Sequence, residues 1–596
     1  MAKNDNGHGS QHFFTYFGLY FSGFNFLGIV LALGGIFYRW FFVLYFLLGI
    51  ILFTCFIEKY KKKIIYPDRY FWAVAVLSLL FIFLNAHFTT PTIFSGRDQG
   101  SFSQAAIMMS QNHRLDVSFP AEKQFFQIYS SGHALNFPGF DYLQNGRLIS
   151  QFPVGYTSWL AIFYSFFGVS GFVLANSIAF FVFMLGFYYL AKNYLESFWP
   201  LLSVILVATC FVFSWFFKFT LSENLTLPLL WLAILEFVLF LKHKKKLHLF
   251  TSIVLLLVLA FTRFEAWFFL FAAAAVLLGQ YRGHLKKLSA FFGKKELFFL
   301  GVIFLVYVGS IFLLPSLYLS AIKGLYSSFF KPGQSGEAPV STGATIWYIA
   351  RLFFSYALLN YLLVALVAFF YFLKKRNYQI LIPFFITLPA FIYLAHPSIS
   401  LDQPWMLRRY VFAVIPASIL YTTILISSLY NGKKHLFKFL LLAILLISNL
   451  AALIPTISLS DNKGLSAETK KLAVNFSPHD LVLVDRMASG NSWSMMTGPL
   501  MTLHGIQAVY FFNPGDARKI DTSGFDNVYV VIPEQSWALY QNSAIADKLH
   551  AVNDYSIKFD MLTLPKENKN DIISEPITFP ELNPSITYGK IFKLEK

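Results

Sequence analysis

The stretch WAVAVLSLLFIFL at residues 72–84 is apolar throughout, and FSGRDQGSFSQAAIMM, which begins with polar and charged residues, follows it at residues 94–109. Runs such as LHLFTSIVLLLVLAF (247–261) and FKFLLLAILLISNLAALIP (437–455) repeat the first pattern. Each approaches the ~20 apolar residues that a helix needs to cross a bilayer. The alternation of such runs with polar segments predicts a polytopic α-helical membrane protein.

The composition of the whole chain leads to the same prediction. Of its 596 residues, 57% are hydrophobic and 13% are charged, which is a larger apolar share than soluble domains have. The formal net charge is +17, but the basic residues form short clusters between apolar runs, which argues against a nucleic-acid partner. Both cysteines, Cys55 and Cys210, lie in apolar runs, so no disulfide or cysteine metal site is predicted.

The basic clusters set the expected orientation, because Lys and Arg concentrate in cytoplasmic loops. The clusters are residues 58–63, 242–248, 281–287, 374–376 and 432–438. With these inside, we expect a multi-pass protein of the cell membrane with a cytoplasmic N-terminus, about 13 transmembrane helices and an external C-terminus. Residues 89–150 then form the first external loop, and 316–345 and 397–408 are further external loops.

Some apolar segments are not expected to be simple crossings. Residues 153–167 are short and begin with a proline, so we expect a re-entrant or interfacial helix. Residues 249–280 are interrupted by Thr262, Arg263 and Glu265, which favours two short helices that meet near the outer surface. Residues 347–373 and 379–396 are each expected to cross once.

A second domain is expected after the last apolar run. Residues 1–456 form the transmembrane domain, and residues 457–596 have the composition and length of a soluble domain. LVLVDR (481–486) and NVYVVIP (527–533) are typical of buried strands, and residues 491–504 of a helix between strands. We therefore expect an extracytoplasmic α/β domain. It is either a lid or an acceptor-docking module without chemistry of its own, or a domain that contributes to the chemistry.

Charged residues gather at the outer ends of several predicted spans. These residues are Arg97, Asp98, Glu223, Arg263, Glu265, Arg408 and Arg409. Charges at membrane depth are costly and need partners, so this group is the first candidate for a functional site. Asp98 precedes a helix whose apolar spacing suits a helix lying on the membrane; its alternative role is an N-cap.

GRDQG at residues 96–100, followed by a helix and then by QFPVGYTSWLAIFYSFFG (151–168), resembles GT-C glycosyltransferases. The branch it resembles contains protein O-mannosyltransferases and lipid A aminoarabinose transferases, and SENLTLPLL (222–230), TRFEA (262–266) and RRYVFAVIP (408–416) are weaker matches. The resemblance implies a GT-C-like fold with a C-terminal domain. It also implies an inverting transfer of a sugar from polyprenyl phosphate to an acceptor hydroxyl, with Asp98 as the general base.

The remaining charged residues are assigned from their chemistry. Arg408, Arg409 and Arg263 are expected to bind the donor phosphate, because a guanidinium group matches phosphate oxygens; the alternative for Arg409 is an interfacial anchor. The other pocket residues are expected to be Arg97, Gln99, Glu223, Glu265 and Tyr410. Glu223 and Glu265 either contact substrate or form a structural salt bridge with Arg263 or Lys218.

Cofactor and partner expectations complete the hypothesis. Gln99 stands where relatives often carry a second acid, which argues against a divalent metal, and His113, His133 and His396 are expected to be solvated loop residues. The expected partners are a polyprenyl-phosphate-linked sugar, a glycan, lipid or protein acceptor, and membrane lipids, with no nucleic acid. The alternatives are a transporter or flippase of a lipid-linked precursor and a non-catalytic envelope-assembly scaffold; charges clustered at one face favour the enzyme.

Overall fold

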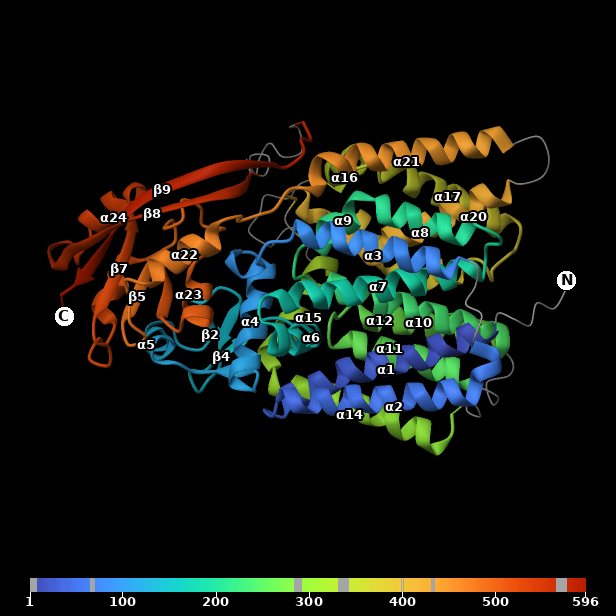
Figure 1. The fold of residues 1–596 in the computed structure, drawn as a ribbon, viewed down its shortest axis with the longest axis horizontal. Coiled ribbons are helices and arrows are strands. Elements are labelled where there is room, and N and C mark those ends of the chain that lie inside the picture. Colours follow the sequence, from blue (N-terminus) through green and yellow to red (C-terminus); the bar gives the residue numbers. More distant parts are fainter. Residues whose placement is uncertain are drawn as a thin grey trace.

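A helical bundle and a C-terminal sheet domain make up the protein. The computed structural model describes residues 8–64, 70–282, 292–330, 342–397, 399, 401–429, 435–563 and 576–595. Figure 1 shows the bundle with the C-terminal domain packed against one of its ends. The first external loop lies between these two parts, so it connects the bundle to the C-terminal domain.

Most of the bundle consists of helices that are apolar over their whole circumference, as expected of helices buried in lipid or among each other. The helices are α1 (His8–Leu33), α2 (Arg39–Ile64), α3 (Phe71–His87), α6 (Val154–Phe167), α7 (Ser170–Lys192), α8 (Trp199–Thr209), α9 (Phe211–Phe217), α10 (Glu223–His243), α11 (Lys246–Ala260), α12 (Ala266–Gln280), α14 (Lys294–Leu313), α15 (Pro315–Phe330), α16 (Thr342–Ser355), α17 (Leu359–Lys374), α18 (Ile382–Thr387), α19 (Arg408–Val411), α20 (Val414–Ser428) and α21 (His435–Ile457), with 3-10 segments η3 (Leu388–Leu394) and η4 (Trp405–Leu407).

The multi-pass prediction is confirmed by the lengths of these helices. In the described part of the chain, six helices are long and apolar enough to cross a membrane, or up to nine if each bent pair is one span, and four shorter apolar helices accompany them. Two short helices, α11 and α12, occupy residues 249–280 as predicted, with their break at residues 261–265. The total of about 13 crossings stays a prediction.

Two predicted single crossings are not continuous α-helices, and whether each crosses once stays a prediction. Residues 347–373 are divided between α16 and α17, which meet at an angle of 109°. Residues 379–396 contain the six-residue helix α18 followed by the 3-10 segment η3. The predicted external loop at 316–345 is helical up to Phe330, and its residues 331–341 lie outside the described residues.

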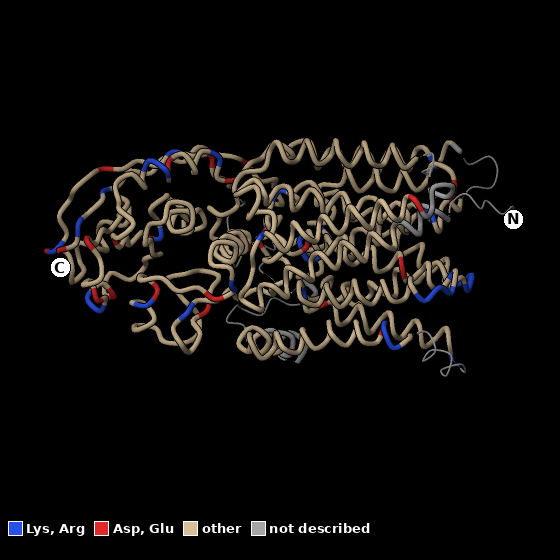
Figure 2. The backbone as a smooth tube through the Cα atoms, turned by 60° about the horizontal axis from the view of Figure 1, so that its bottom comes forward, with Lys and Arg blue, Asp and Glu red and all other residues tan. Residues whose placement is uncertain are grey.

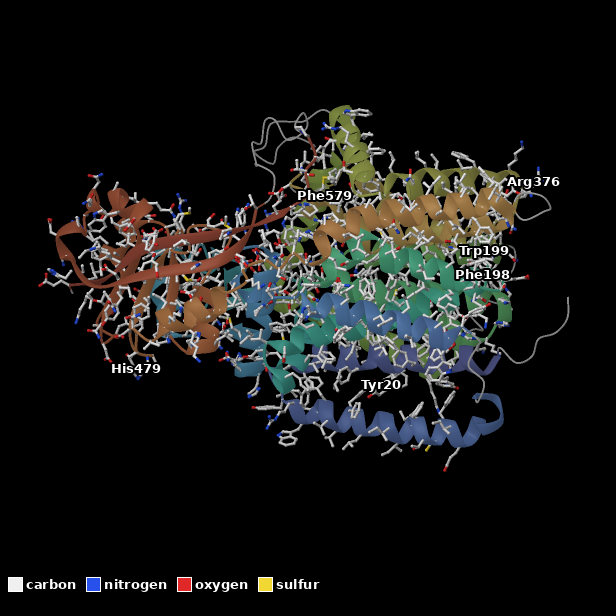
Figure 3. All side chains as sticks on the ribbon, turned by 45° about the horizontal axis from the view of Figure 1, so that its top comes forward. Tyr20, Phe198, Trp199, Arg376, His479 and Phe579 are labelled. Atoms are coloured by element: carbon white, nitrogen blue, oxygen red, sulfur yellow. The ribbon has the colours of Figure 1, made fainter. Side chains whose placement is uncertain are left out.

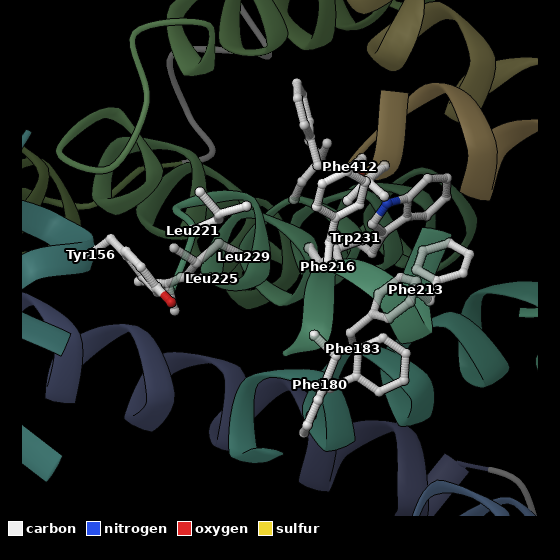
Figure 4. Packing of buried hydrophobic residues seen from close by; sticks show 14 of the residues in the cluster. Tyr156, Phe180, Phe183, Phe213, Phe216, Leu221, Leu225, Leu229, Trp231 and Phe412 are labelled. Carbon is white, nitrogen blue, oxygen red and sulfur yellow. The ribbon is translucent and has the colours of Figure 1, made fainter. Parts of the chain in front are cut away.

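Helix α10 is the centre of the bundle. It packs against both α7 and α11, and 94% of the residues in its apolar stretch are buried. The ring of Trp231 in this helix lies 5.2 Å from that of Phe187, and Figure 4 shows Trp231 beside Phe412. The indole Nε1 of Trp231 donates to the backbone oxygen of Phe412 at 2.9 Å. This contact joins α10, which carries Glu223, to the segment that follows Arg408 and Arg409. It therefore fixes the relative position of two elements that carry charged site residues.

Charged residues outside the site mark the two ends of the molecule. Figure 2 shows Lys and Arg at the bundle end far from the C-terminal domain, and again over that domain. In Figure 3, Arg376 and Trp199 lie at this far end, whereas His479 lies on the C-terminal domain. The predicted cytoplasmic cluster at residues 374–376 therefore lies opposite the C-terminal domain, as the predicted orientation requires.

The first external loop folds into a small α/β unit. It contains η2 (Thr92–Phe94), α4 (Asp98–Asn112), β1 (Asp116–Val117), α5 (Pro120–Tyr129), β2 (Gly132–His133), β3 (Phe140–Tyr142) and β4 (Leu148–Ser150), with the antiparallel sheet order β1-β4-β3-β2. Helix α4 does not expose the apolar face that a helix lying on a membrane would have, because its apolar residues are buried in the protein. It packs between α6 and the C-terminal domain, and its polar Ser103 is buried because it hydrogen-bonds Thr92 and Thr220 at 2.8 and 2.9 Å.

The C-terminal domain is the predicted α/β fold. Its elements are α22 (Leu465–Ala473), β5 (Leu481–Asp485), α23 (Thr497–His504), β6 (Gln507–Phe511), β7 (Val528–Pro533), α24 (Trp537–Gln541), β8 (Leu549–Thr563) and β9 (Glu581–Leu594). The sheet order is β6-β5-β7-β9-β8, with β5 parallel to β6 and β7. Phe125 and Phe137 of the first loop share one apolar core with Leu483 and Val509, so loop and domain form one packed body.

Candidate active site

A cavity of about 640 Å³ opens among α4, α10, the α11–α12 turn, η3 and α19. Its polar lining comprises Asp98, Ser222, Glu223, Thr262, Arg263, Glu265, Tyr393, His396, Arg408 and Arg409. The elements that supply these residues are spread along the sequence from α4 to α19, and their cavity residues all lie at the same end of the bundle. The apolar remainder of the lining includes Phe102, Phe152 and Phe269.

Asp98 is positioned by a tight turn at the start of α4. Gly100 is required there, because a Cβ at this position would lie 1.8 Å from the backbone oxygen of Ser95. The helix starts at Asp98, after Arg97, and no side chain caps it. The Asp98 carboxylate instead pairs with the Nη1 atom of Arg408 at 2.6 Å. The side chain of Asp98 remains 39% exposed, so it can meet a substrate that enters the cavity.

The charge of Asp98 is set by two opposing influences. Partial removal from water raises the pKa of its carboxyl, but the guanidinium of Arg408, aided by Arg409 and Arg97, outweighs this effect and holds the pKa below the ordinary value. The carboxylate is therefore ionised at neutral pH. An ionised carboxylate can accept a proton, which is the requirement for a general base.

Arg263 forms the centre of a second charge cluster. Its guanidinium pairs with Glu223 at 2.7 Å and with Glu265 at 2.6 Å. The hydroxyl of Tyr393 donates to Glu265 at 2.7 Å, and Arg409 approaches the same carboxylate at 3.6 Å. Of the two roles predicted for Glu223 and Glu265, substrate contact or a salt bridge, the structure shows salt bridges with Arg263.

Lys218, the other predicted partner of these acids, serves a different contact. Its Nζ atom donates to the backbone oxygens of Thr456, Ile457 and Leu459 at 3.3, 3.2 and 2.8 Å. These oxygens belong to the end of α21 and the start of the connection to the C-terminal domain. Lys218 therefore fixes this connection rather than the cavity.

The cavity has donor groups that suit an anion. Within the described residues, the Nε atoms of Arg263 and Arg408 are buried without a hydrogen-bond partner. Nη atoms of the same guanidinium groups hold carboxylates, and both residues line the cavity, so an entering phosphate competes with these carboxylates for the N–H donors. A guanidinium is well suited to this because its donors lie in one plane and match carboxylate or phosphate oxygens.

Three residues predicted for the pocket lie outside its lining. Arg97 points away from the cavity and pairs with Asp402 at 2.5 Å. Gln99 is buried within α4, where its backbone oxygen accepts from Ser103 and Thr220. Tyr410 is fully buried and donates to the backbone oxygen of Tyr393 at 2.8 Å, so it supports a lining residue.

Four polar lining residues were not among those predicted, namely Ser222, Thr262, Tyr393 and His396. Tyr393 lies in an apolar run that gave no signal of a charged partner, and only its contact with Glu265 shows its place. His396 is exposed, as expected of a solvated loop residue, and it also lines the cavity. In the described part of the chain, no group of three His, Cys, Asp or Glu side chains is arranged to hold a metal ion; the acids of the cavity are instead paired with arginines.

The helical bundle, the folded first loop that carries an acid over a charged cavity, and the C-terminal domain together define a multi-pass membrane protein with the GT-C fold. Solved structures share this arrangement. ArnT from Cupriavidus metallidurans in the apo state matches with a TM-score of 0.51 and 12% identity, covering 81% of this chain and 95% of that chain. ArnT bound to undecaprenyl phosphate matches with a TM-score of 0.52 and 11% identity, covering 82% and 97%.

The likeness to ArnT, a lipid A aminoarabinose transferase, confirms the fold predicted from the GRDQG motif. No protein-family model matches the sequence, and no curated protein matches it either. At 11 and 12% identity, the similarity is one of fold. Function must therefore be argued from the cavity itself.

Proposed function

We propose that this protein transfers a sugar from a polyprenyl-phosphate donor to an acceptor hydroxyl at the outer face of the membrane, with inversion at the anomeric carbon. The observation that carries this proposal is the placement of Asp98 in one cavity with Arg263, Arg408 and Arg409. A carboxylate can take a proton from a hydroxyl, and arginines can stabilise a leaving phosphate. The ArnT structure with undecaprenyl phosphate supports a donor of this class.

A second, apolar cavity of about 570 Å³ offers a place for the isoprenoid chain of the donor. It runs along α12 and α18, where the small residues Ala272, Ala275 and Gly279 leave room. Leu388 and Pro389 line both this cavity and the charged one. A lipid phosphate at the charged cavity could therefore extend its chain along the apolar one.

The proposed step balances as a single displacement. Asp98 accepts the proton of the acceptor hydroxyl while the acceptor oxygen forms a bond to the anomeric carbon. The bond from that carbon to the phosphate oxygen breaks, and polyprenyl phosphate leaves with the electron pair. The arginines of the cavity stabilise the charge that develops on the leaving phosphate.

The ion pair between Asp98 and Arg408 couples the two substrates in this proposal. While Arg408 holds the carboxylate, the pKa of Asp98 stays low and the group is a weak base. A donor phosphate competes for Arg408 and so raises the pKa of Asp98. The base becomes stronger only when a donor is bound, which limits unproductive proton uptake in the empty cavity.

The proposal is tested by turnover of purified protein in lipid. Labelled sugars are supplied on a panel of polyprenyl phosphates, and transfer or slow hydrolysis of the donor is measured. Release of labelled sugar supports the proposal. Movement of intact donor between leaflets without release would favour a transporter, and binding with neither outcome would favour a scaffold.

We expect the Arg408→Gln variant to shift the acidic limb of the pH–rate profile to higher pH. In the wild type, the pKa of Asp98 lies below its ordinary value of about 3.9, so activity that needs the carboxylate persists as the pH falls through that value. Without Arg408, the influence of burial is larger, the pKa rises, and activity is lost at higher pH. Measurement of kcat/KM against pH checks this, and an unmoved acidic limb would contradict the pairing.

A further inference from the structure

A second polar cavity lies on the other side of the turn that carries Asp98. It encloses about 230 Å³ between the first external loop, η4 and the C-terminal domain, and we call it the interdomain cavity. Its lining includes Arg97, Trp405, Asp461, Asn491, Trp493 and Ser494. Arg97 lines the interdomain cavity and the next residue, Asp98, lines the charged one, so the two cavities lie back to back.

The charges of the interdomain cavity do not favour an anion. The guanidinium of Arg97 lies between two indole rings, 5.2 Å from the ring centre of Trp405 and 4.8 Å from that of Trp493. Its charge is balanced by Asp402 at 2.5 Å. Asp461 adds a further carboxylate. A phosphate would gain little here, in contrast to the three arginines of the charged cavity.

The same lining suits a neutral molecule that carries hydroxyl groups. The indole N–H of Trp405 is buried without a hydrogen-bond partner within the described residues, and the residue is only 4% exposed. Burial raises the pKa of Asp461 to about 6, and this carboxyl can accept from a hydroxyl. Trp493 offers a broad, partly exposed ring for the C–H face of a ligand.

We propose that the interdomain cavity binds one neutral sugar ring of a glycan acceptor, adjacent to the ring whose hydroxyl reacts at Asp98. Binding of the neutral ring is argued from the lining of the interdomain cavity, and only the reaction of the neighbouring ring at Asp98 rests on the proposed function. The volume is below the ~300 Å³ at which sites for drug-sized ligands begin, so a single ring fits better than a longer chain. Through Asn491 and Trp493, the C-terminal domain then takes part in recognising the acceptor.

The test measures binding of sugars to the full-length protein in lipid nanodiscs, without any donor. The probes are methyl glycosides of neutral hexoses and their disaccharides, titrated by saturation-transfer NMR. The variants are Trp493→Ala, which removes the exposed ring, and Asp461→Asn, which keeps shape and removes the charge. Tyr588→Ala is the matched control, because Tyr588 is an exposed aromatic residue of the same domain outside the cavity.

We expect at least one glycoside to bind, with affinity reduced about tenfold or more by Trp493→Ala and unchanged by Tyr588→Ala. Binding that is weakened equally by both variants, or no glycoside binding by the wild type, would overturn the inference. Binding of undecaprenyl phosphate is measured in the same samples. If the lipid binds and the glycosides do not, this inference alone fails; if Trp493-dependent glycoside binding occurs without lipid binding, the proposed donor fails and the sugar site stands.

Discussion

Asp98→Asn is expected to reduce sugar transfer by about 10²- to 10⁴-fold, the usual contribution of a positioned general base. The amide keeps the shape of the side chain but cannot accept the hydroxyl proton. It also loses the charge that pairs with Arg408. Donor binding is expected to persist, because the freed guanidinium remains in the cavity. The measurement is the single-turnover rate of labelled-sugar transfer at saturating donor.

Asp116→Asn is the matched control for this prediction. Asp116 lies in the same external loop and also pairs with arginines, at 2.6 Å from Arg114 and 2.5 Å from Arg147, but it is outside the cavity. Its pairs are partly exposed, so their loss is expected to cost no more than about 1 kcal/mol of stability. A rate for Asp98→Asn that equals that of Asp116→Asn would remove Asp98 as the base.

The convergence of the charged residues could be predicted from the sequence for a physical reason. Charges that border apolar runs must lie at a membrane boundary, and the orientation from basic loops places Glu223, Arg263, Glu265 and Arg408 at the same boundary. The structure brings these residues into one cavity. Their pairing follows because a buried carboxylate needs a nearby cation.

The direction of single side chains could not be predicted in the same way. Arg97 and Asp98 are neighbours at a helix start, yet they line opposite cavities, because Arg97 is extended while Asp98 begins the helix. The bend between α16 and α17 could not be predicted from the sequence either. It occurs at Ala357, which has a φ of 60°, in an apolar run with no glycine or proline to indicate it.

The burial of α4 shows a related limit of pattern analysis. Its apolar spacing predicted one buried face and one polar face. The polar face is buried as well, because Ser103 hydrogen-bonds Thr92 and Thr220, and because α23 of the C-terminal domain packs against the helix. A sequence pattern reports how polar a face is, but not whether a distant segment supplies hydrogen bonds to cover it.

Arg263→Met is expected to destabilise the protein by about 3–5 kcal/mol, the usual result of removing one partner from a buried ion pair. Arg263 is 7% exposed and holds two carboxylates, Glu223 and Glu265. Without it, both acids are buried close together with less positive charge to balance them. The measurement is the free energy of unfolding in detergent, followed by the fluorescence of the buried tryptophans.

Two comparisons separate this charge effect from simple loss of packing. Arg147→Met removes the same side chain from a pair that is 29% exposed on the arginine side, and it is expected to cost about 1 kcal/mol or less. Arg263→Met combined with Glu223→Gln and Glu265→Gln removes the unbalanced charges, so most of the lost stability should return. If the triple variant is no more stable than Arg263→Met alone, the arginine stabilises the site by packing against Phe412, 4.7 Å from its guanidinium carbon, rather than by neutralising the two acids.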